Sequence, residues 1–287
     1  MGSLGKPLRF VRARLAELGS APLRYAYLGN DTAILTTRAD LRMLVDTRDR
    51  ALTPHLATTG RWEPDVERTL DRLLRRGQRV VEVGANIGYH TLTMAKRIGP
   101  TGHIDAFEPN PHICGLLRDT IFLNGFNAIV TVHECAALDR AGPVKFQFNP
   151  RFGGGGNVVV PGYEDPTNQH FEVAGVRLDD VLAAEPPVDL LRMDAEGSEA
   201  LVLWGGEQLL RRSPGVRIVM EFAPGMLRPR GEVREFAGWL ASLGFKAWRI
   251  EPSGALAKLA MAELAELPHC EIVLSRDVPP GARRSGR

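Results

Sequence analysis

The sequence has few cysteines, almost no net charge and no long hydrophobic run. Its 287 residues include three cysteines, Cys114, Cys135 and Cys270, which form no C-x-x-C pair and cannot all be paired within one chain. Reduced thiols in a cytosolic protein are the simplest explanation, so we expect a cytoplasmic location. No run approaches the ~18 apolar residues of a membrane span, and the first residues lack the apolar core of a signal peptide. We therefore expect no stable membrane insertion.

The charges of the chain are nearly balanced. The formal net charge is +2 at pH 7, and 24% of the residues are charged. Proteins that bind nucleic acid or acidic membranes usually carry a strong basic excess. We therefore expect no nucleic-acid partner. The sequence leaves the oligomeric state open, a homodimer included.

A strand, a glycine-containing turn and a helix follow one another between residues 80 and 98. The strand ends at Glu82-Val83, and the turn reads Gly84-Ala85-Asn86-Ile87-Gly88. Apolar residues then recur at helical spacing. Glycines let the backbone come close to a ligand, and the start of a helix offers unpaired N–H groups. A second strand, at 103–107, ends at Glu108-Pro109-Asn110, where nucleoside-binding α/β folds place an acid against ribose hydroxyls.

Two common nucleotide motifs are excluded at this turn. A dinucleotide fingerprint would need glycine at 84, 86 and 89, where the chain has Gly84, Asn86 and Tyr89. No Lys-Ser/Thr pair follows the turn, so it is not a phosphate-binding P-loop. The spacing of Glu82, Gly84, Asn86 and Gly88, with Glu108 downstream, resembles the S-adenosylmethionine turn of class I methyltransferases.

Strands and helices alternate from residue 79 to residue 276, which predicts a parallel sheet with helices on both faces. We expect strands near 80–83, 103–107, 130–134, 188–193, 216–221, 245–250 and 270–275. We expect helices near 90–98, 111–124, 176–184, 198–211, 232–243 and 256–265. The predicted fold is α/β, with a Rossmann-like class I methyltransferase sheet of seven strands whose last strand is antiparallel.

The remaining segments predict additions to this domain. Residues 1–78 read as a small β/α appendage: a short amphipathic helix within 1–20, a β-meander at 22–47 and a lid helix. The methyltransferase domain is expected at 79–277, and 278–287 is expected to be a flexible tail. An insert at 140–175 fits no crossover helix. Its strand at 144–148 alternates like an exposed strand, and its glycine run makes it either a lid over the substrate or a surface loop.

Several motifs in order are similar to those of the FkbM-type methyltransferases, a class I family. The motifs are Gly60-Arg61-Trp62-Glu63, Glu82 to Gly88, Phe107 to Pro111, Asn124-Gly125, Cys135-Ala136-Ala137, Arg177 to Asp180, Leu191 to Glu199 and Val219 to Phe222. The segment Asp194-Ala195-Glu196-Gly197-Ser198-Glu199 after a strand is the most specific of them. Arg192 stands where such proteins often have lysine, and Glu82 where many have aspartate.

The resemblance implies an O-methyltransferase that uses S-adenosyl-L-methionine on a small-molecule or glycan acceptor: a sugar, a glycolipid or a polyketide-type natural product. The turn would hold the amino-acid end of the donor, Glu108 its ribose, and residues 134–137 its adenine. The residues expected to bind the donor are Glu63, Glu82, Gly84, Ala85, Asn86, Gly88, Glu108, Pro109, Asn110, Ala136 and Asp194.

An alcohol needs a general base, because it is a poor nucleophile while it keeps its proton. The catalytic candidates are Asp194, Glu196 and Glu221, near the carboxyl ends of adjacent strands, and Asp194 would face the methyl group most directly. A second hypothesis has these acids, or Glu199, binding Mg²⁺ through oxygen ligands. We do not favour it, since no histidine or dense carboxylate spacing demands a metal. For Glu199 a structural role in the first turn of a helix is favoured.

Three rival functions fit the chain less well, and a nucleic-acid methyltransferase is the nearest of them. Methyltransferases that attack base amino groups typically carry Asn/Asp-Pro-Pro-aromatic after the fourth strand, where this chain has Asp194-Ala195-Glu196-Gly197. An acidic site would also repel phosphates. Two further alternatives are a small-molecule N-methyltransferase and a non-catalytic scaffold with the same fold. Calorimetry that shows no binding of the donor would favour the scaffold.

Overall fold

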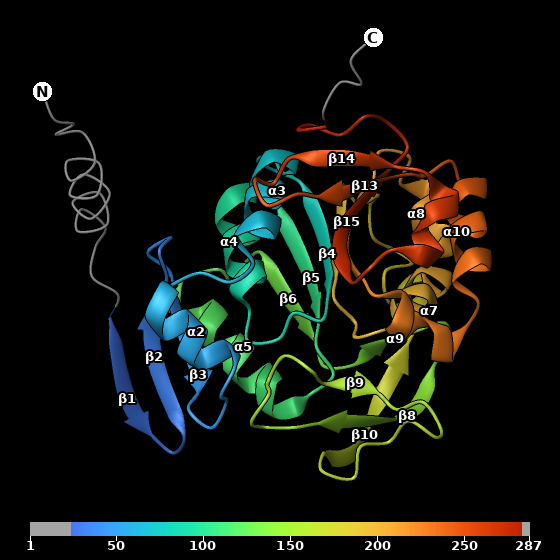
Figure 1. The fold of residues 1–287 in the computed structure, drawn as a ribbon. Helices are drawn as coiled ribbons and strands as arrows, with labels where there is room; N and C mark the ends of the chain where they lie inside the picture. Colours follow the sequence, from blue (N-terminus) through green and yellow to red (C-terminus); the bar gives the residue numbers. More distant parts are fainter. Residues whose placement is uncertain (1–23, 283–287) are drawn as a thin grey trace, which may run out of the picture.

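The computed structural model describes residues 24–282 and contains a large mixed sheet with helices on both faces (Figure 1). The sheet order is β14-β13-β15-β12-β11-β4-β5-β6. The bounds are β4 Arg79–Val83, β5 His103–Phe107, β6 Val130–His133, β11 Leu190–Met193, β12 Arg217–Phe222, β13 Lys246–Ile250, β14 Leu256–Leu259 and β15 Cys270–Ser275. The strands from β6 to β12 are parallel, and β15 runs antiparallel to both β12 and β13. The predicted α/β fold with an antiparallel last strand is confirmed, but the sheet has eight strands and not the seven predicted.

β14 is an eighth strand that the sequence analysis missed. The helix predicted at 256–265 is wrong over its first half, because β14 pairs antiparallel with β13 from Leu256↔Ile250 to Leu259↔Ala247. Gly254, with φ of +67°, makes the turn between the two strands. Leu256 is 1% exposed in this pairing. Only a short 3₁₀ helix, η2 (Met261–Glu266), follows.

Alternate residues of the central strands face two separate hydrophobic cores. Leu191 and Ile218 pack on one face of the sheet, whereas Leu190 and Val219 pack on the other. The first face is covered by α6 (Leu178–Val181), α7 (Glu199–Gly205), α8 (Glu207–Arg212), α9 (Pro224–Leu227) and α10 (Val233–Ser242), and the 3₁₀ turn η1 (Arg228–Arg230) follows α9. The second is covered by α3 (Pro64–Leu73), α4 (Tyr89–Ile98) and α5 (Pro111–Leu123). The single helix predicted at 198–211 is divided at Gly206 into α7 and α8.

A three-stranded antiparallel sheet precedes the main sheet, as the meander prediction requires. It consists of β1 (Tyr25–Gly29), β2 (Thr32–Thr36) and β3 (Arg42–Asp46), and α2 (Leu52–Thr59) follows. Its inner face, with Met43 and Val45, shares a core with Leu92 of α4 and Ile113 of α5. The helix predicted within 1–20 lies outside the described residues.

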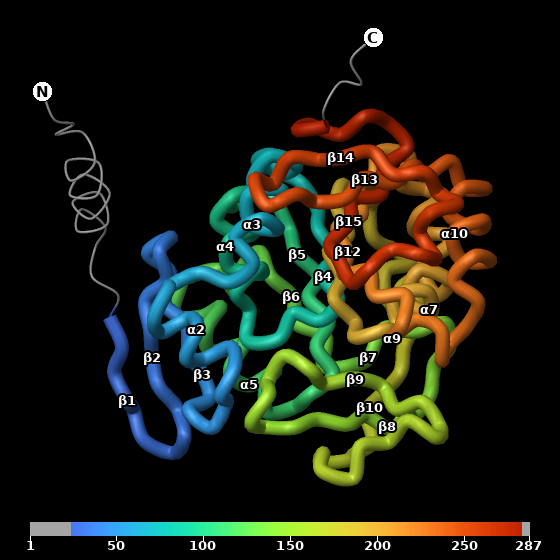
Figure 2. The backbone as a smooth tube through the Cα atoms, viewed as in Figure 1, coloured from blue at the N-terminus to red at the C-terminus, as the bar shows by residue number. Residues whose placement is uncertain are grey.

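The insert folds as a small sheet of order β7-β10-β8-β9, with β7 Ala136–Ala137, β8 Gly142–Phe148, β9 Asn157–Val158 and β10 Gln169–Val176. The prediction of an exposed strand at 144–148 is wrong: Val144, Phe146 and Phe148 are buried in the core shared with the N-terminal sheet. Figures 1 and 2 show β8, β9 and β10 beside the ends of β4 and β5.

The start of the predicted flexible tail is attached to the fold. Ala282 forms an isolated β-bridge with Leu256 and packs on the core below α3. Residues 283–287 lie outside the described part of the chain. Within the described residues, no helix combines the length and hydrophobicity that crossing a membrane requires.

Candidate active site

A cavity opens at the carboxyl ends of β4, β5, β11 and β12, where open α/β sheets bind their ligands. The turn after β4 forms one wall. Gly84, Asn86 and Gly88 all have positive φ, and the N–H groups of Gly84 and Ala85 donate to the Phe107 carbonyl at 3.0 and 3.1 Å. A Cβ on Gly84 would lie 1.9 Å from the Asp194 carbonyl oxygen. The glycine thus lets the ends of β4 and β11 approach each other.

Glu108 holds this turn from the next strand. Its Oε2 accepts the Asn86 N–H at 3.0 Å, and its Oε1 accepts the Asn110 N–H at 2.9 Å. Burial raises the pKa of Glu108 to about 7, despite the two backbone hydrogen bonds. Its side chain lines the cavity together with Pro109.

Three of the residues predicted to bind the donor do not line the cavity: Glu82, Gly88 and Asn110. Glu82 is fully buried below the turn, where its Oε2 accepts the Thr91 hydroxyl at 2.6 Å. Gly88 is the N-cap residue of α4, and the Asn110 side chain caps the start of α5 by accepting the N–H of His112. The other predicted donor-binding residues line the cavity: Glu63, Gly84, Ala85, Asn86, Glu108, Pro109, Ala136 and Asp194.

Arg192 of β11 lies among three carboxylates on the cavity floor. It donates to the Gly84 carbonyl at 3.1 Å and to Asp194 Oδ2 at 3.2 Å, and it lies 3.5 Å from Glu63 Oε2. Its side chain is only 7% exposed, so the pairs compensate much of the cost of burying its charge. Arg192 therefore links the donor turn to the acids after β11. In the sequence analysis, Arg192 was noted only because similar proteins often have lysine at this position, and none of these contacts was predicted.

Glu63 reaches the cavity from the residue before α3. Its Oε2 lies 2.9 Å from Nε2 of His90. Burial and the charge of Arg192 lower the pKa of His90, so the imidazole is neutral at pH 7 and donates this hydrogen bond. Burial alone would raise the pKa of Glu63, but the hydrogen bond from His90 and the charge of Arg192 lower it to about 2. Glu63 is thus a fixed negative charge beside the donor turn.

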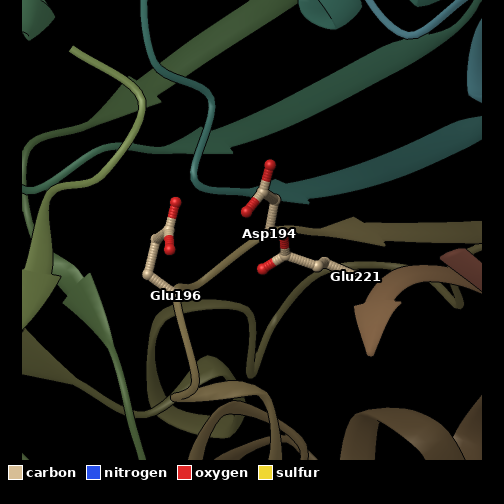
Figure 3. Close-up of side chains that lie close together, drawn as sticks. All are labelled: Asp194, Glu196 and Glu221. Atoms are coloured by element: carbon tan, nitrogen blue, oxygen red, sulfur yellow. The ribbon is translucent and has the colours of Figure 1, made fainter. Parts of the chain in front are cut away.

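The three predicted catalytic acids converge beside Arg192, at the ends of β11 and β12. Asp194, Glu196 and Glu221 bring carboxylate oxygens within 4.8 Å of one another (Figure 3). Burial, with the negative charge of Asp194, raises the pKa of Glu196 to about 9 and that of Glu221 to about 8. Burial also raises the pKa of Asp194, against the lowering effect of Arg192. Oxygen ligands this close could coordinate a divalent cation, or they could share a proton.

The turn that carries Glu196 is closed by Glu199, which does not join the cluster. Glu199 Oε1 accepts the N–H groups of Ala195 and Gly197 at 2.9 and 3.3 Å. Glu199 is 1% exposed and does not line the cavity, so its predicted structural role agrees with its position. Glu196 itself has φ of 50°, a conformation that non-glycine residues adopt at a cost of roughly 1–3 kcal/mol.

The insert covers the cavity and is attached to the donor turn. The Asn86 side chain donates to the Gly153 carbonyl at 2.8 Å, and the Gly153 N–H donates to Asp49 at 2.9 Å. Phe146, Phe148 and Val158 supply apolar lining, as do Leu52 and Trp62 from the N-terminal segment. The sequence analysis named none of these five as site residues, although Phe146, Phe148 and Val158 lie in the segment that it considered as a lid. Their contacts with the cavity join segments far apart in the chain.

Residues 82–247 match the family model described as the FkbM methyltransferase domain, which covers more than half of the chain. The chain is a member of this family. The FkbM-type methyltransferase therefore takes its methyl group from S-adenosyl-L-methionine.

Curated relatives match parts of the sequence of this FkbM-type methyltransferase. A methyltransferase of Sordaria araneosa, sdnD, is 28% identical over 53% of this chain and 70% of its own length. A protein-L-isoaspartate O-methyltransferase of Ignicoccus hospitalis is 37% identical over 21% of this chain, which spans only 28% of that relative. Among solved structures, an O-methyltransferase from Bacillus cereus in complex with SAH aligns with a TM-score of 0.45 and 16% identity, over 75% of this chain and 81% of that one.

The cavity of the FkbM-type methyltransferase has the chemistry to hold this donor. The donor carries a positive sulfonium, and the lining includes the carboxylates of Glu63, Glu108 and Asp194. Each oxygen of Glu108 accepts one backbone N–H, which leaves lone pairs for ribose hydroxyls. The bend at Gly84 lets the backbone come close to a ligand.

Proposed function

We propose that the protein is an O-methyltransferase that acts on a hydroxyl of a sugar, a glycolipid or a polyketide-type natural product. The observation that carries this proposal is the cluster of Asp194, Glu196 and Glu221 at the edge of the donor cavity. A hydroxyl must lose a proton as it attacks, so a group of carboxylates with raised pKa values is suited to it. An amine that attacks as a free base has less need of such a cluster.

The donor supplies an electrophilic methyl group, and the protein's part is to orient and to deprotonate the acceptor. We propose that Gly84, Ala85 and Asn86 hold the amino-acid end of the donor, that Glu108 holds the ribose, and that the segment around Ala136 lies by the adenine. Glu63 adds a negative charge beside the turn. Orientation of this kind can supply roughly 7–11 kcal/mol of a reaction barrier.

We propose that the three clustered acids act together as the general base. Asp194 is oriented by Arg192, while burial and the neighbouring acids raise the pKa of Glu196 to about 9. Acids that interact this strongly titrate as a group, so the proton is shared among them. Base catalysis of this type contributes about 10²–10⁴ in rate.

The acidic lining of the cavity disfavours some acceptors. Its negative charge repels phosphate groups, so we propose a small-molecule or glycan acceptor and no nucleic acid. We further propose a cytoplasmic reaction, in keeping with three cysteines that are free in the structure.

The test is the Asp194→Ala variant. We expect its affinity for the donor, measured by calorimetry, to stay within a few fold, while transfer of labelled methyl to a panel of a methyl glycoside, a glycolipid and a hydroxylated macrolactone falls by about 10²-fold or more. Glu235→Gln, an exposed acid on α10, is the matched control. Activity that survives EDTA supports the base. Loss with EDTA and recovery with Mg²⁺ would instead assign the cluster to a metal. Tighter binding of NAD than of the donor would contradict the proposal altogether.

A further inference from the structure

A histidine contacts the acid cluster from outside the cavity. His269 immediately precedes β15, and its Nε2 lies 2.7 Å from Glu221 Oε1. The His269 side chain is 61% exposed, whereas that of Glu221 is 13% exposed. Glu221 lines the cavity and His269 does not. The Glu221 carboxylate therefore lies between the cavity and an imidazole in contact with solvent.

Glu221 has a free oxygen besides the one that His269 contacts. Its Oε2 is buried and has no hydrogen-bond partner. The Glu221 carboxylate also reaches within 4.8 Å of Asp194 and Glu196, and the three side chains turn toward one another (Figure 3). A carboxyl group can take a proton on one oxygen and give it up from the same group to a second partner. Glu221 thus has the position of a bridge between the cluster and His269.

Methylating a hydroxyl leaves a proton inside this site. The acceptor oxygen gains the methyl group and loses its proton, and the electron pair of the broken sulfur–carbon bond stays on sulfur. The proton passes to the carboxylates of the cluster, which must lose it again before the next turnover. The Glu221 side chain is only 13% exposed and the three acids line the cavity, so the proton needs a route to solvent while donor and acceptor fill that cavity.

We propose that His269 is the exit for this proton. Glu221 takes the proton from Asp194 or Glu196 and passes it to Nε2 of His269. The ring then releases a proton from Nδ1 to water, and exchange with water restores the starting tautomer, so no net charge accumulates. His269 touches neither donor nor acceptor, and it acts only through Glu221. The inference rests on the proposed O-methylation.

The test uses two substitutions, His269→Ala and His269→Gln, with the panel hydroxyl that the wild type methylates as acceptor. In dilute buffer we expect kcat to fall about tenfold or more in both variants, with donor affinity and acceptor KM within about twofold of wild type. Glutamine can still donate a hydrogen bond to Glu221 but cannot carry a proton. Because the site is exposed, added imidazole should restore most of kcat in His269→Ala.

His112→Ala is the matched control. His112 is also an exposed histidine paired with a buried acid, with Nε2 2.8 Å from Asp46 Oδ2, but neither residue lines the donor cavity. We expect no imidazole-dependent change in its kcat. Wild-type kcat in His269→Gln, or a loss in His269→Ala that imidazole does not restore, would overturn the relay and leave O-methylation standing. A wild type that binds the donor but methylates no hydroxyl would overturn both.

Discussion

Gly84 and Glu196 show how much the site depends on single backbone positions. A side chain on Gly84 would collide with the Asp194 carbonyl, and Glu196 holds a positive φ that few non-glycine residues adopt. The two turns are therefore in close contact, and Arg192 ties them together through the Gly84 carbonyl and Asp194. Strain of this kind persists only where the surrounding contacts hold it.

The raised pKa values predict that stability falls as the pH rises. The folded-state pKa of Glu196 is about 9 and that of Glu221 about 8, against 4.5 for an ordinary glutamate. Between pH 4.5 and 9 the folded protein therefore holds more protons than the unfolded chain, and its free energy of unfolding decreases as pH increases. Between about pH 7 and 9, we expect the free energy of unfolding of Glu196→Gln to fall by on the order of 1–2 kcal/mol less than that of the wild type.

Urea unfolding at several pH values measures this effect. Glu235→Gln serves again as control and should keep the slope of the wild type. An unchanged slope in Glu196→Gln would mean that Glu196 is ionised in the folded protein at neutral pH. Under the general-base proposal, kcat should rise over the same pH range, because the cluster must be ionised to accept a proton.

Among the elements, those with local signals were predictable and those formed by distant pairing were not. The strand before Gly84 and the strand before Glu108 are short apolar runs that end in a turn, and each falls within a residue of its predicted place. The burial of β8 depends on the N-terminal core, far away in the sequence. β14 was missed for another reason: its Ala- and Leu-rich sequence favours a helix, and pairing with β13 overrides that preference. Likewise Asp194 and Glu196 follow directly from a motif, whereas the approach of His269 to Glu221 requires the antiparallel pairing of β15 with β12.

The attachment of the insert leads to a prediction about Arg230 in η1. Its guanidinium donates to the Val158 carbonyl of β9 at 2.6 Å and to the Met226 carbonyl at 3.2 Å. It also lies against Gly197, next to Glu196. Arg230→Met should loosen β9 over the cavity by about 1–2 kcal/mol, which corresponds to roughly a fivefold to thirtyfold rise in acceptor KM.

Steady-state kinetics and calorimetry separate the two binding steps. Donor affinity should hardly change in Arg230→Met, because the donor turn has its own contacts with Glu108 and Arg192. Arg234→Met removes an exposed arginine paired with Glu266 and should alter neither parameter. A lower donor affinity with unchanged acceptor KM would show that Arg230 supports the donor turn instead.

In the whole molecule, the N-terminal sheet and the main sheet share one core. Met43 and Val45 pack with Leu92 and Ile113, and the Leu44 N–H donates to the Thr120 hydroxyl of α5 at 3.0 Å. Because parts that share a core tend to unfold together, we expect residues 24–78 to unfold with the main domain. The domain boundary at residue 78 stays a prediction.

Met43→Ala tests this shared core. We expect it to lower the free energy of unfolding of the whole chain by roughly 2–5 kcal/mol, with circular dichroism and tryptophan fluorescence following a single transition. Ala257→Ser, on the edge strand β14 and only partly buried, should have a much smaller effect. Two separated transitions would show instead that residues 24–78 unfold by themselves.

Because β15 lies between β12 and β13, the main sheet cannot be completed before β15 has left the ribosome. β13 has only β14 and β15 as neighbours, so it cannot join the sheet before β15 does. A nascent chain that has emerged only to residue 269 already contains the donor turn and every acid of the cluster, but its sheet still ends at β12. Among the described strands, β15 is thus the one that completes this sheet, and it sets the histidine before it against Glu221.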